Sequence, residues 1–212
     1  MSDSQFKAII FDFGGVLLDW NPRYLYRRYF DSEMAVEAFL SEIGFAEWNL
    51  LQDRGRPFDN GVAELSNRFP QHSALIRAYK DSWQESLAGT IPGSVRIVER
   101  LKRAGYALYG LSNWSAETFP IAQDRFDFLA LFDDIVISGA VGMAKPEPGI
   151  FQLLLQRIGR PPQECLFIDD GPANIAAARS LGLTTIHFKG PEQLERELTE
   201  MRVLGREETR WV

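Results

Sequence analysis

Three apolar runs of the sequence each end in polar side chains that could carry chemistry: Asp12, the pair Ser112 and Asn113, and the pair Asp169 and Asp170. If these runs are neighbouring parallel strands, their carboxyl ends lie at one edge of a sheet, where such folds bind ligands. Three carboxylates at one place repel one another unless a cation compensates them. Carboxylate oxygens suit Mg²⁺, and a carboxylate can also act as a nucleophile. The pattern therefore predicts a site built around Asp12.

Other polar or flexible positions could complete this site. Lys145 could supply positive charge to a transition state, and Ser112 and Asn113 could donate hydrogen bonds to a phosphate oxygen. Gly14 and Gly15 would let backbone N–H groups approach an anion closely. Each feature alone has a structural explanation, such as a turn or a helix cap. Their combination, in order along the chain, favours function.

The elements that position these residues alternate between strand and helix. Buried strands are predicted by five apolar runs, at 8–12, 107–111, 134–138, 165–168 and 184–188. Amphipathic helices are predicted between them at 94–104, with Ser94 as its cap, at 147–158 and at 173–181. This alternation is typical of a doubly wound, Rossmann-like α/β fold with a parallel sheet, formed by residues 1–17 and 90–212.

The segment between residues 18 and 89 has a different hydrophobic pattern. It shows amphipathic spacing at 22–30, 33–43, 61–69 and 74–87, and no convincing strand. We expect an all-helical domain inserted after the first strand and rejoining the core near Thr90. Such an insert beside a strand-end site can serve as a lid.

Composition narrows the class of protein. The 212 residues carry 23 Lys and Arg against 29 Asp and Glu, a net charge of −6. A dedicated nucleic-acid or anionic-membrane binder would show a basic surplus, so neither partner is expected. The single cysteine, Cys165, is expected in the core. No membrane span or signal peptide fits the sequence, so a cytoplasmic monomer or homodimer is expected.

The motifs resemble those of the haloacid dehalogenase (HAD) superfamily. The resemblance rests on residues 11–17 with Asp12, Leu111-Ser112-Asn113, Lys145-Pro146 and residues 167–170, and it covers nearly the whole chain, including a helical cap. It implies that Asp12 is the nucleophile and binds Mg²⁺ together with the Gly14 carbonyl, Asp169 and Asp170. It further implies that Ser112 holds the phosphate with Asn113 beside it, that Lys145 neutralises charge, and that a small phosphorylated metabolite is hydrolysed through an aspartyl-phosphate.

One position departs from the family pattern. Most HAD phosphatases carry a second aspartate two residues after the nucleophile as general acid and base, and here that residue is Gly14. Positioned acid catalysis is typically worth about 10²–10⁴-fold. Either another residue supplies the proton, with Asp19 the nearest in sequence, or the leaving group is good, as in a sugar 1-phosphate, or the enzyme is not a phosphatase.

The third possibility points to 2-haloacid dehalogenases of the same superfamily, which also lack the second aspartate and need no metal. They carry serines where this chain has Asp169 and Asp170, which favours the metal-dependent phosphatase. Small phosphatases similar to a glucose-1-phosphate phosphatase have this first motif, the Asp-Asp pair and an asparagine at the place of Asn174. A catalytically weak phosphate-binding protein is a further alternative.

Substrate specificity should come from the insert and its seam with the core. The residues expected to contact the substrate, besides Gly14 and Gly15, are Trp20, Asn21, Arg54 and Trp114, with Trp48 and Asp53 as further candidates. Aromatic rings can stack on sugars, although core packing is the simpler explanation for Trp48. An ion pair is an equally good explanation for Arg54.

Overall fold

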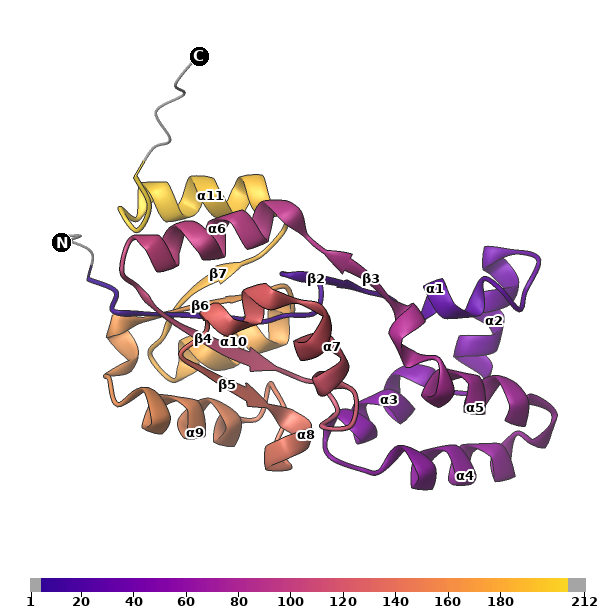
Figure 1. Cartoon of the computed structure of the whole chain (residues 1–212). Coiled ribbons are helices and arrows are strands. Elements are labelled where there is room, and N and C mark those ends of the chain that lie inside the picture. Colours follow the sequence, from indigo (N-terminus) through magenta and orange to yellow (C-terminus); the bar gives the residue numbers. More distant parts are fainter. Residues whose placement is uncertain (1–4, 206–212) are drawn as a thin grey trace, which may run out of the picture.

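A computed structural model describes residues 5–205 and contains a five-stranded parallel sheet in the order β5-β4-β1-β6-β7 (Figure 1). The strands are β1 (Ala8–Phe11), β4 (Ala107–Ser112), β5 (Asp134–Ile137), β6 (Cys165–Asp169) and β7 (Thr184–His187). All five predicted strands are present, within one or two residues of their expected bounds. The parallel α/β fold predicted from the alternating pattern is therefore confirmed.

Both faces of the sheet are buried, as the unbroken apolar runs require. On β1, Ile9 and Phe11 belong to one hydrophobic cluster and Ala8 and Ile10 to the other. Successive side chains of a strand point to opposite faces, so each face has its own core. Cys165 lies in the second core, as expected.

Helices cover the two faces of the sheet. Helices α6 (Pro92–Arg103) and α11 (Pro191–Glu200) pack together on one face, and α9 (Pro148–Ile158) and α10 (Pro172–Ser180) on the other (Figure 1). Two shorter helices, α7 (Phe119–Arg125) and α8 (Ser138–Val141), follow β4 and β5. The predicted cap Ser94 is instead a buried helix residue, because α6 begins at Pro92, whose fixed φ suits a first helical position.

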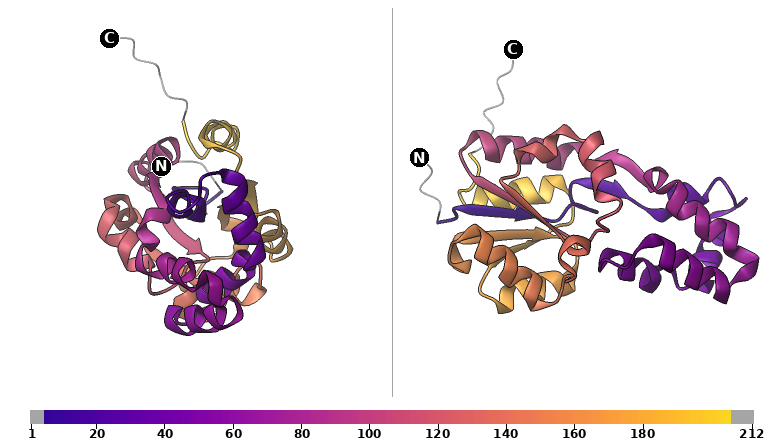
Figure 2. Two further views of the ribbon diagram at one scale, coloured as in Figure 1. Left: turned by 90° about the vertical axis from the view of Figure 1, so that its right-hand side faces the viewer. Right: turned by 60° about the horizontal axis from the view of Figure 1, so that its bottom comes forward.

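The inserted segment is mostly helical and lies beyond the carboxyl ends of the strands (Figure 2). It contains α1 (Pro22–Tyr26), α2 (Glu33–Glu42), α3 (Phe45–Asp53), α4 (Phe58–Arg68) and α5 (Ser73–Asp81). Aromatic side chains hold it together: Phe45 lies edge-on to Tyr79, with ring centroids 4.9 Å apart, and Trp48 donates to the Gly61 carbonyl at 2.9 Å. Trp48 is therefore a packing residue.

The two ends of the insert form an element that the sequence pattern did not predict. Strands β2 (Leu18–Trp20) and β3 (Leu87–Thr90) pair antiparallel, so the segment 18–89 is not entirely helical. Three or four residues are too few to show a strand period, and Leu87 had been placed at the end of a helix. The antiparallel pair of β2 and β3 connects the insert to the core. Within residues 5–205, no helix is long and apolar enough to cross a membrane.

Candidate active site

Asp12 follows β1 at the carboxyl edge of the sheet, and its orientation is fixed by contacts to one carboxylate oxygen. Asp12 Oδ1 accepts hydrogen bonds from the Phe13 amide at 2.7 Å and from Ser112 Oγ at 2.9 Å. Lys145 Nζ lies 2.9 Å from the same oxygen. Because these three contacts converge on Oδ1, they leave Oδ2 for a substrate or a cation.

Lys145 lies between two carboxylates and is buried. Its Nζ is 2.9 Å from Asp12 Oδ1 and 2.7 Å from Asp169 Oδ2. Burial alone would lower the pKa of Lys145, but the attraction of Asp12 and Asp169 overcomes it and raises the pKa above its ordinary value. Lys145 is therefore an ammonium at neutral pH and compensates charge on Asp12.

The side chain of Asn113 holds the backbone of Lys145. Its Nδ2 donates to the Lys145 carbonyl at 2.9 Å, and its Oδ1 accepts from the Lys145 amide at 2.8 Å. This two-point contact sets the position of Lys145 relative to Asp12. Asn113 thus already has a positioning contact, and its predicted hydrogen bond to phosphate stays a prediction.

Asp169 is buried at the end of β6, and its orientation is fixed by hydrogen bonds to Oδ1, the oxygen that does not contact Lys145. Its Oδ1 accepts from the Gly171 amide at 2.7 Å and from Asn174 Nδ2 at 2.9 Å. Asn174, which the sequence had marked, therefore positions this carboxylate.

Asp170 is exposed and faces the glycine turn after Asp12. Gly15 has a φ of +74°, and a Cβ there would lie 2.4 Å from Asp170 Oδ2. Both the backbone conformation and the close approach require glycine at this position. A Cβ on Gly14, in contrast, would meet nothing within 4 Å.

The three carboxylates form a cluster whose chemistry fits a divalent cation. One oxygen from each of Asp12, Asp169 and Asp170 lies within 4.8 Å of the others. Burial raises the pKa of Asp12 to about 7 against the attraction of Lys145, and Asp169 adds to the rise. Burial, followed by repulsion from Asp169, also raises the pKa of Asp170. One ammonium does not balance three carboxylates, so the cluster has the charge and hard oxygen donors that suit Mg²⁺.

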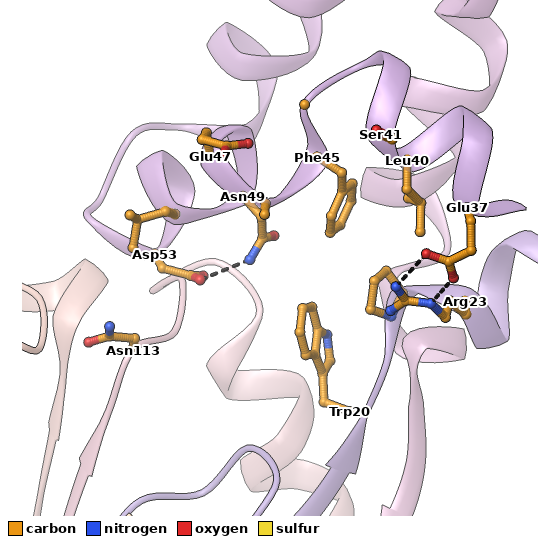
Figure 3. A pocket seen from close by; sticks show the side chains of 14 residues that line it. Trp20, Arg23, Glu37, Leu40, Ser41, Phe45, Glu47, Asn49, Asp53 and Asn113 are labelled. Atoms are coloured by element: carbon orange, nitrogen blue, oxygen red, sulfur yellow. Dashed lines mark hydrogen bonds and ion pairs between the residues drawn. The ribbon is translucent and has the colours of Figure 1, made fainter. Parts of the chain in front are cut away.

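A cavity of about 660 Å³ opens in the helical insert and reaches Asn113 of the core (Figure 3). Its polar side chains include Asn49 and Asp53 of α3, and the ion-paired Arg23 and Glu37 lie at the other end. Trp20 and Phe45 present aromatic surface to it. Such a mixture of aromatic and polar walls is typical of small-molecule sites.

A smaller cavity of about 60 Å³ lies at the seam between insert and core. It is lined by Gly14, Asn113 and Trp114 of the core and by Trp20, Asn49, Asp53, Tyr79 and Trp83. Trp20, Asn49, Asp53 and Asn113 line both cavities, so the two share a wall. The seam connects the glycine turn after Asp12 with the insert.

The predicted substrate residues separate into two groups. Trp20 lines both cavities and Trp114 lines the seam cavity, whereas Asn21 caps α1, because its Oδ1 accepts a hydrogen bond from the Arg23 amide at 3.0 Å. Arg54 is exposed and forms an ion pair with Glu147 of the core. Arg54 and Asn21 therefore have structural partners, and their predicted substrate contacts stay predictions.

Sequence reasoning missed several cavity residues. Asn49, Tyr79 and Glu37 come from three different helices, and the aromatic Phe45 comes from the missed helix α3. Amphipathic spacing finds the buried side of each helix but not which helix ends face a common space. No motif marked these residues.

Comparison with known proteins defines the class. The family model of haloacid dehalogenase-like hydrolases matches residues 6–182. The chain belongs to this family and is an HAD-like hydrolase.

Two curated relatives of similar length have phosphatase names. The chain is 27% identical to the sesquiterpene phosphatase astK of Aspergillus oryzae, covering 87% of this chain and 91% of the relative. It is 24% identical to a phosphorylated carbohydrates phosphatase of Thermotoga maritima, covering 85% and 84%. Another relative, the drimenol cyclase drtB of Aspergillus calidoustus, is 29% identical, and the chain spans only 36% of its length.

Solved structures share the fold over almost the whole chain. An HAD-like family hydrolase from Porphyromonas gingivalis superposes with a TM-score of 0.71 at 25% identity, covering 93% of this chain and 98% of the other. An HAD family enzyme from Bacteroides thetaiotaomicron, solved as a magnesium complex, gives 0.73 at 22% identity, covering 92% and 98%.

Proposed function

We propose that the protein is a Mg²⁺-dependent phosphatase that hydrolyses a small organic phosphate through an aspartyl-phosphate on Asp12. One observation carries the proposal: Asp12 lies in a carboxylate cluster with Asp169 and Asp170 and is bound to the buried ammonium of Lys145. The phosphatase names of the relatives astK and the Thermotoga enzyme support it.

In this proposal the cation is held by Asp12, Asp169, Asp170 and the Gly14 carbonyl. When bound, Mg²⁺ polarises the phosphate and offsets its charge. Oδ2 of Asp12 attacks phosphorus while Ser112 Oγ and the Phe13 amide hold Oδ1. Lys145 stabilises negative charge on Asp12 and on the phosphate. Water then cleaves the aspartyl-phosphate and releases inorganic phosphate.

We further propose that residues 18–89 act as a cap over residues 1–17 and 90–212. The cavity in the insert would then hold the leaving group, while the phosphate occupies the core site. A sugar phosphate fits this cavity, because Trp20 and Phe45 could stack on a ring and Asn49 and Asp53 could bind hydroxyls. The name of the Thermotoga relative points to the same substrate class.

The test measures two reactions on the same purified protein. Phosphate release is followed from 4-nitrophenyl phosphate and from sugar 1- and 6-phosphates, with Mg²⁺ or with EDTA. Halide release from 2-chloropropionate is followed in parallel, with Asp12→Asn as the blank. The proposal expects Mg²⁺-dependent phosphate release that is lost in Asp12→Asn. Metal-independent halide release would establish the dehalogenase alternative, and metal binding without either reaction would establish the binding protein.

A further inference from the structure

The proposed phosphatase lacks a proton donor at the usual place, because Gly14 has no side chain. A phosphate ester of an ordinary alcohol leaves slowly as an alkoxide, so an acid positioned at the leaving oxygen matters. Gly14 lines the small seam cavity, and one carboxyl group of the insert lines the same cavity: Asp53, at the end of α3. The structure thus places a carboxyl group in the same cavity as Gly14.

We propose that Asp53 is the general acid that protonates the leaving-group oxygen, and the general base that later activates water. This inference rests on the proposed phosphatase function. Its geometric basis is that Asp53 lines both the seam cavity beside Gly14 and the larger cavity proposed for the leaving group. With the phosphate at Asp12 of the core and the leaving group in the larger cavity, the ester oxygen that joins them would lie at the seam that Asp53 lines.

The hydrogen bonds of Asp53 hold its carboxyl group in place, and they come from uncharged amide groups. Asn49 Nδ2 donates to Asp53 Oδ2 at 2.8 Å, and the Ser115 amide donates a hydrogen bond from the core. Tyr79 binds the other end of Asn49 at 3.1 Å, and Ser138 Oγ of α8 donates to the Asp53 carbonyl. Figure 3 shows the Asp53 carboxyl beside Asn49, in the space that Asn113 borders.

The cations near Asp53 are paired with other carboxylates. Arg54, the next residue, is paired with Glu147, and Arg23 across the larger cavity is paired with Glu37. Glu47 of the same helix lines the larger cavity but is exposed and does not line the seam cavity. Burial raises the pKa of Asp53 to about 7, and the hydrogen bond from Ser115 opposes that rise. A carboxyl group with this pKa can both give and take a proton near neutral pH.

The proton balance closes over the two steps. In the first, Asp12 Oδ2 bonds to phosphorus, the bond from phosphorus to the ester oxygen breaks, and the Asp53 proton passes to that oxygen, which leaves as an alcohol. In the second, Asp53 carboxylate takes a proton from water as the water oxygen bonds to phosphorus. The bond between Asp12 and phosphorus breaks, and both carboxyl groups return to their starting states.

The leaving group provides the experiment. The full chain with Mg²⁺ is compared with Asp53→Asn on 4-nitrophenyl phosphate, whose leaving group needs no proton, and on glycerol 1-phosphate, whose leaving group does. We expect kcat/KM of Asp53→Asn to fall about 10²–10³-fold on the alkyl ester and less than about fivefold on the aryl ester. Asp59→Asn is the matched control, because Asp59 lies on the outside of the insert with its side chain 81% exposed. This control should leave both rates unchanged.

The outcomes separate the inference from the function on which it rests. An equal loss on both esters would show a positioning role and overturn the inference, as would no loss on either. If the wild type releases phosphate from neither ester nor from sugar phosphates, the proposed function fails and the inference with it. In wild type, kcat/KM on the alkyl ester relative to the aryl ester should fall as pH rises above about 7. A ratio independent of pH would overturn the inference even if Asp53→Asn does not fold.

A rescue variant adds a test that a structural role would not pass. Gly14 has room for a side chain, because a Cβ there meets nothing within 4 Å. Adding Gly14→Asp to Asp53→Asn should raise kcat/KM on the alkyl ester at least about tenfold above that of Asp53→Asn alone. No recovery, in a protein whose Gly14→Asp single variant is active, would count against Asp53 as the proton donor.

Discussion

Asp12 of the core and Asp53 of the insert are two carboxyl groups whose pKa burial raises to about 7, in different surroundings. Asp12 lies against the ammonium of Lys145, the Ser112 hydroxyl and a second carboxylate. Asp53 has the Asn49 amide and the Ser115 backbone amide as partners. The ammonium and the carboxylate cluster around Asp12 suit a carboxylate that also binds a cation. The uncharged amides around Asp53 suit a carboxyl group that can be protonated near neutral pH. The two carboxyl groups thus share a pKa direction, and it is their different neighbours that support two different roles.

The largest effect should come from removing the positive charge on the core side of this comparison. Lys145→Met leaves Asp12 and Asp169 buried without their ammonium. We expect phosphatase activity to fall about 10²–10³-fold and the free energy of unfolding to fall by about 3–5 kcal/mol. Phosphate release and urea denaturation measure the two effects.

A matched control is Lys102→Met, because Lys102 pairs with Asp133 at 2.8 Å nearer the surface. This substitution should cost less than about 1 kcal/mol. Equal losses of stability in the two variants would mean that the buried network around Lys145 does not stabilise the core.

A smaller effect on stability is expected when Mg²⁺ binds to the carboxylate cluster of Asp12, Asp169 and Asp170. Mg²⁺ that binds only the folded state stabilises it by about 2.7 kcal/mol at 100 times its Kd. For a chain of this length that corresponds to a rise in Tm of roughly 5–10 °C. Asp170→Asn removes one proposed ligand from the exposed side and should reduce the rise. Thermal unfolding with Mg²⁺ and with EDTA checks this, and an equal rise in both proteins would remove Asp170 from the site.

The difference between core and insert also shows what the sequence could predict. Asp12, Ser112 and Asp169 were found because each stands at the carboxyl end of a buried apolar run, and parallel strands bring such residues to one edge. Asn49 could not be placed, because the apolar residues of α3 do not form a single stripe, and Leu50 and Leu51 are exposed. Asp53 was a candidate for substrate binding because it is a polar residue of the insert. Only the packing of α3 against Ser115 and Ser138 brings it to the core.

The insert side of the comparison predicts a pH effect on stability. The pKa of Asp53 is about 7 in the folded protein and about 3.9 in an unfolded chain. Between these values the folded state holds the extra proton, so this group lowers the free energy of unfolding as pH rises from about 4 to 7. Asp53→Asn removes this pH dependence, so its free energy of unfolding should rise relative to that of wild type by about 2.5 kcal/mol between pH 5 and pH 8. Urea denaturation at both pH values tests it, and a constant difference between the proteins would contradict the assignment.

The smallest effect is expected at Arg54, which is exposed and paired with Glu147 across the seam. Arg54→Met should change the free energy of unfolding by less than about 1 kcal/mol and KM by less than about threefold. Steady-state kinetics and thermal unfolding check both values. A tenfold rise in KM would instead show that Arg54 contacts the substrate, as its position in the sequence had suggested.

The most direct test of the proposed mechanism is to trap the phosphorylated enzyme. Wild type is mixed with a phosphorus-labelled substrate and Mg²⁺, quenched during turnover, digested and analysed by mass spectrometry. We expect a hydroxylamine-sensitive phosphoryl group on the peptide that contains Asp12, and none in Asp12→Asn. Phosphate release without any label on that peptide, undiminished in Asp12→Asn, would contradict the central role of Asp12.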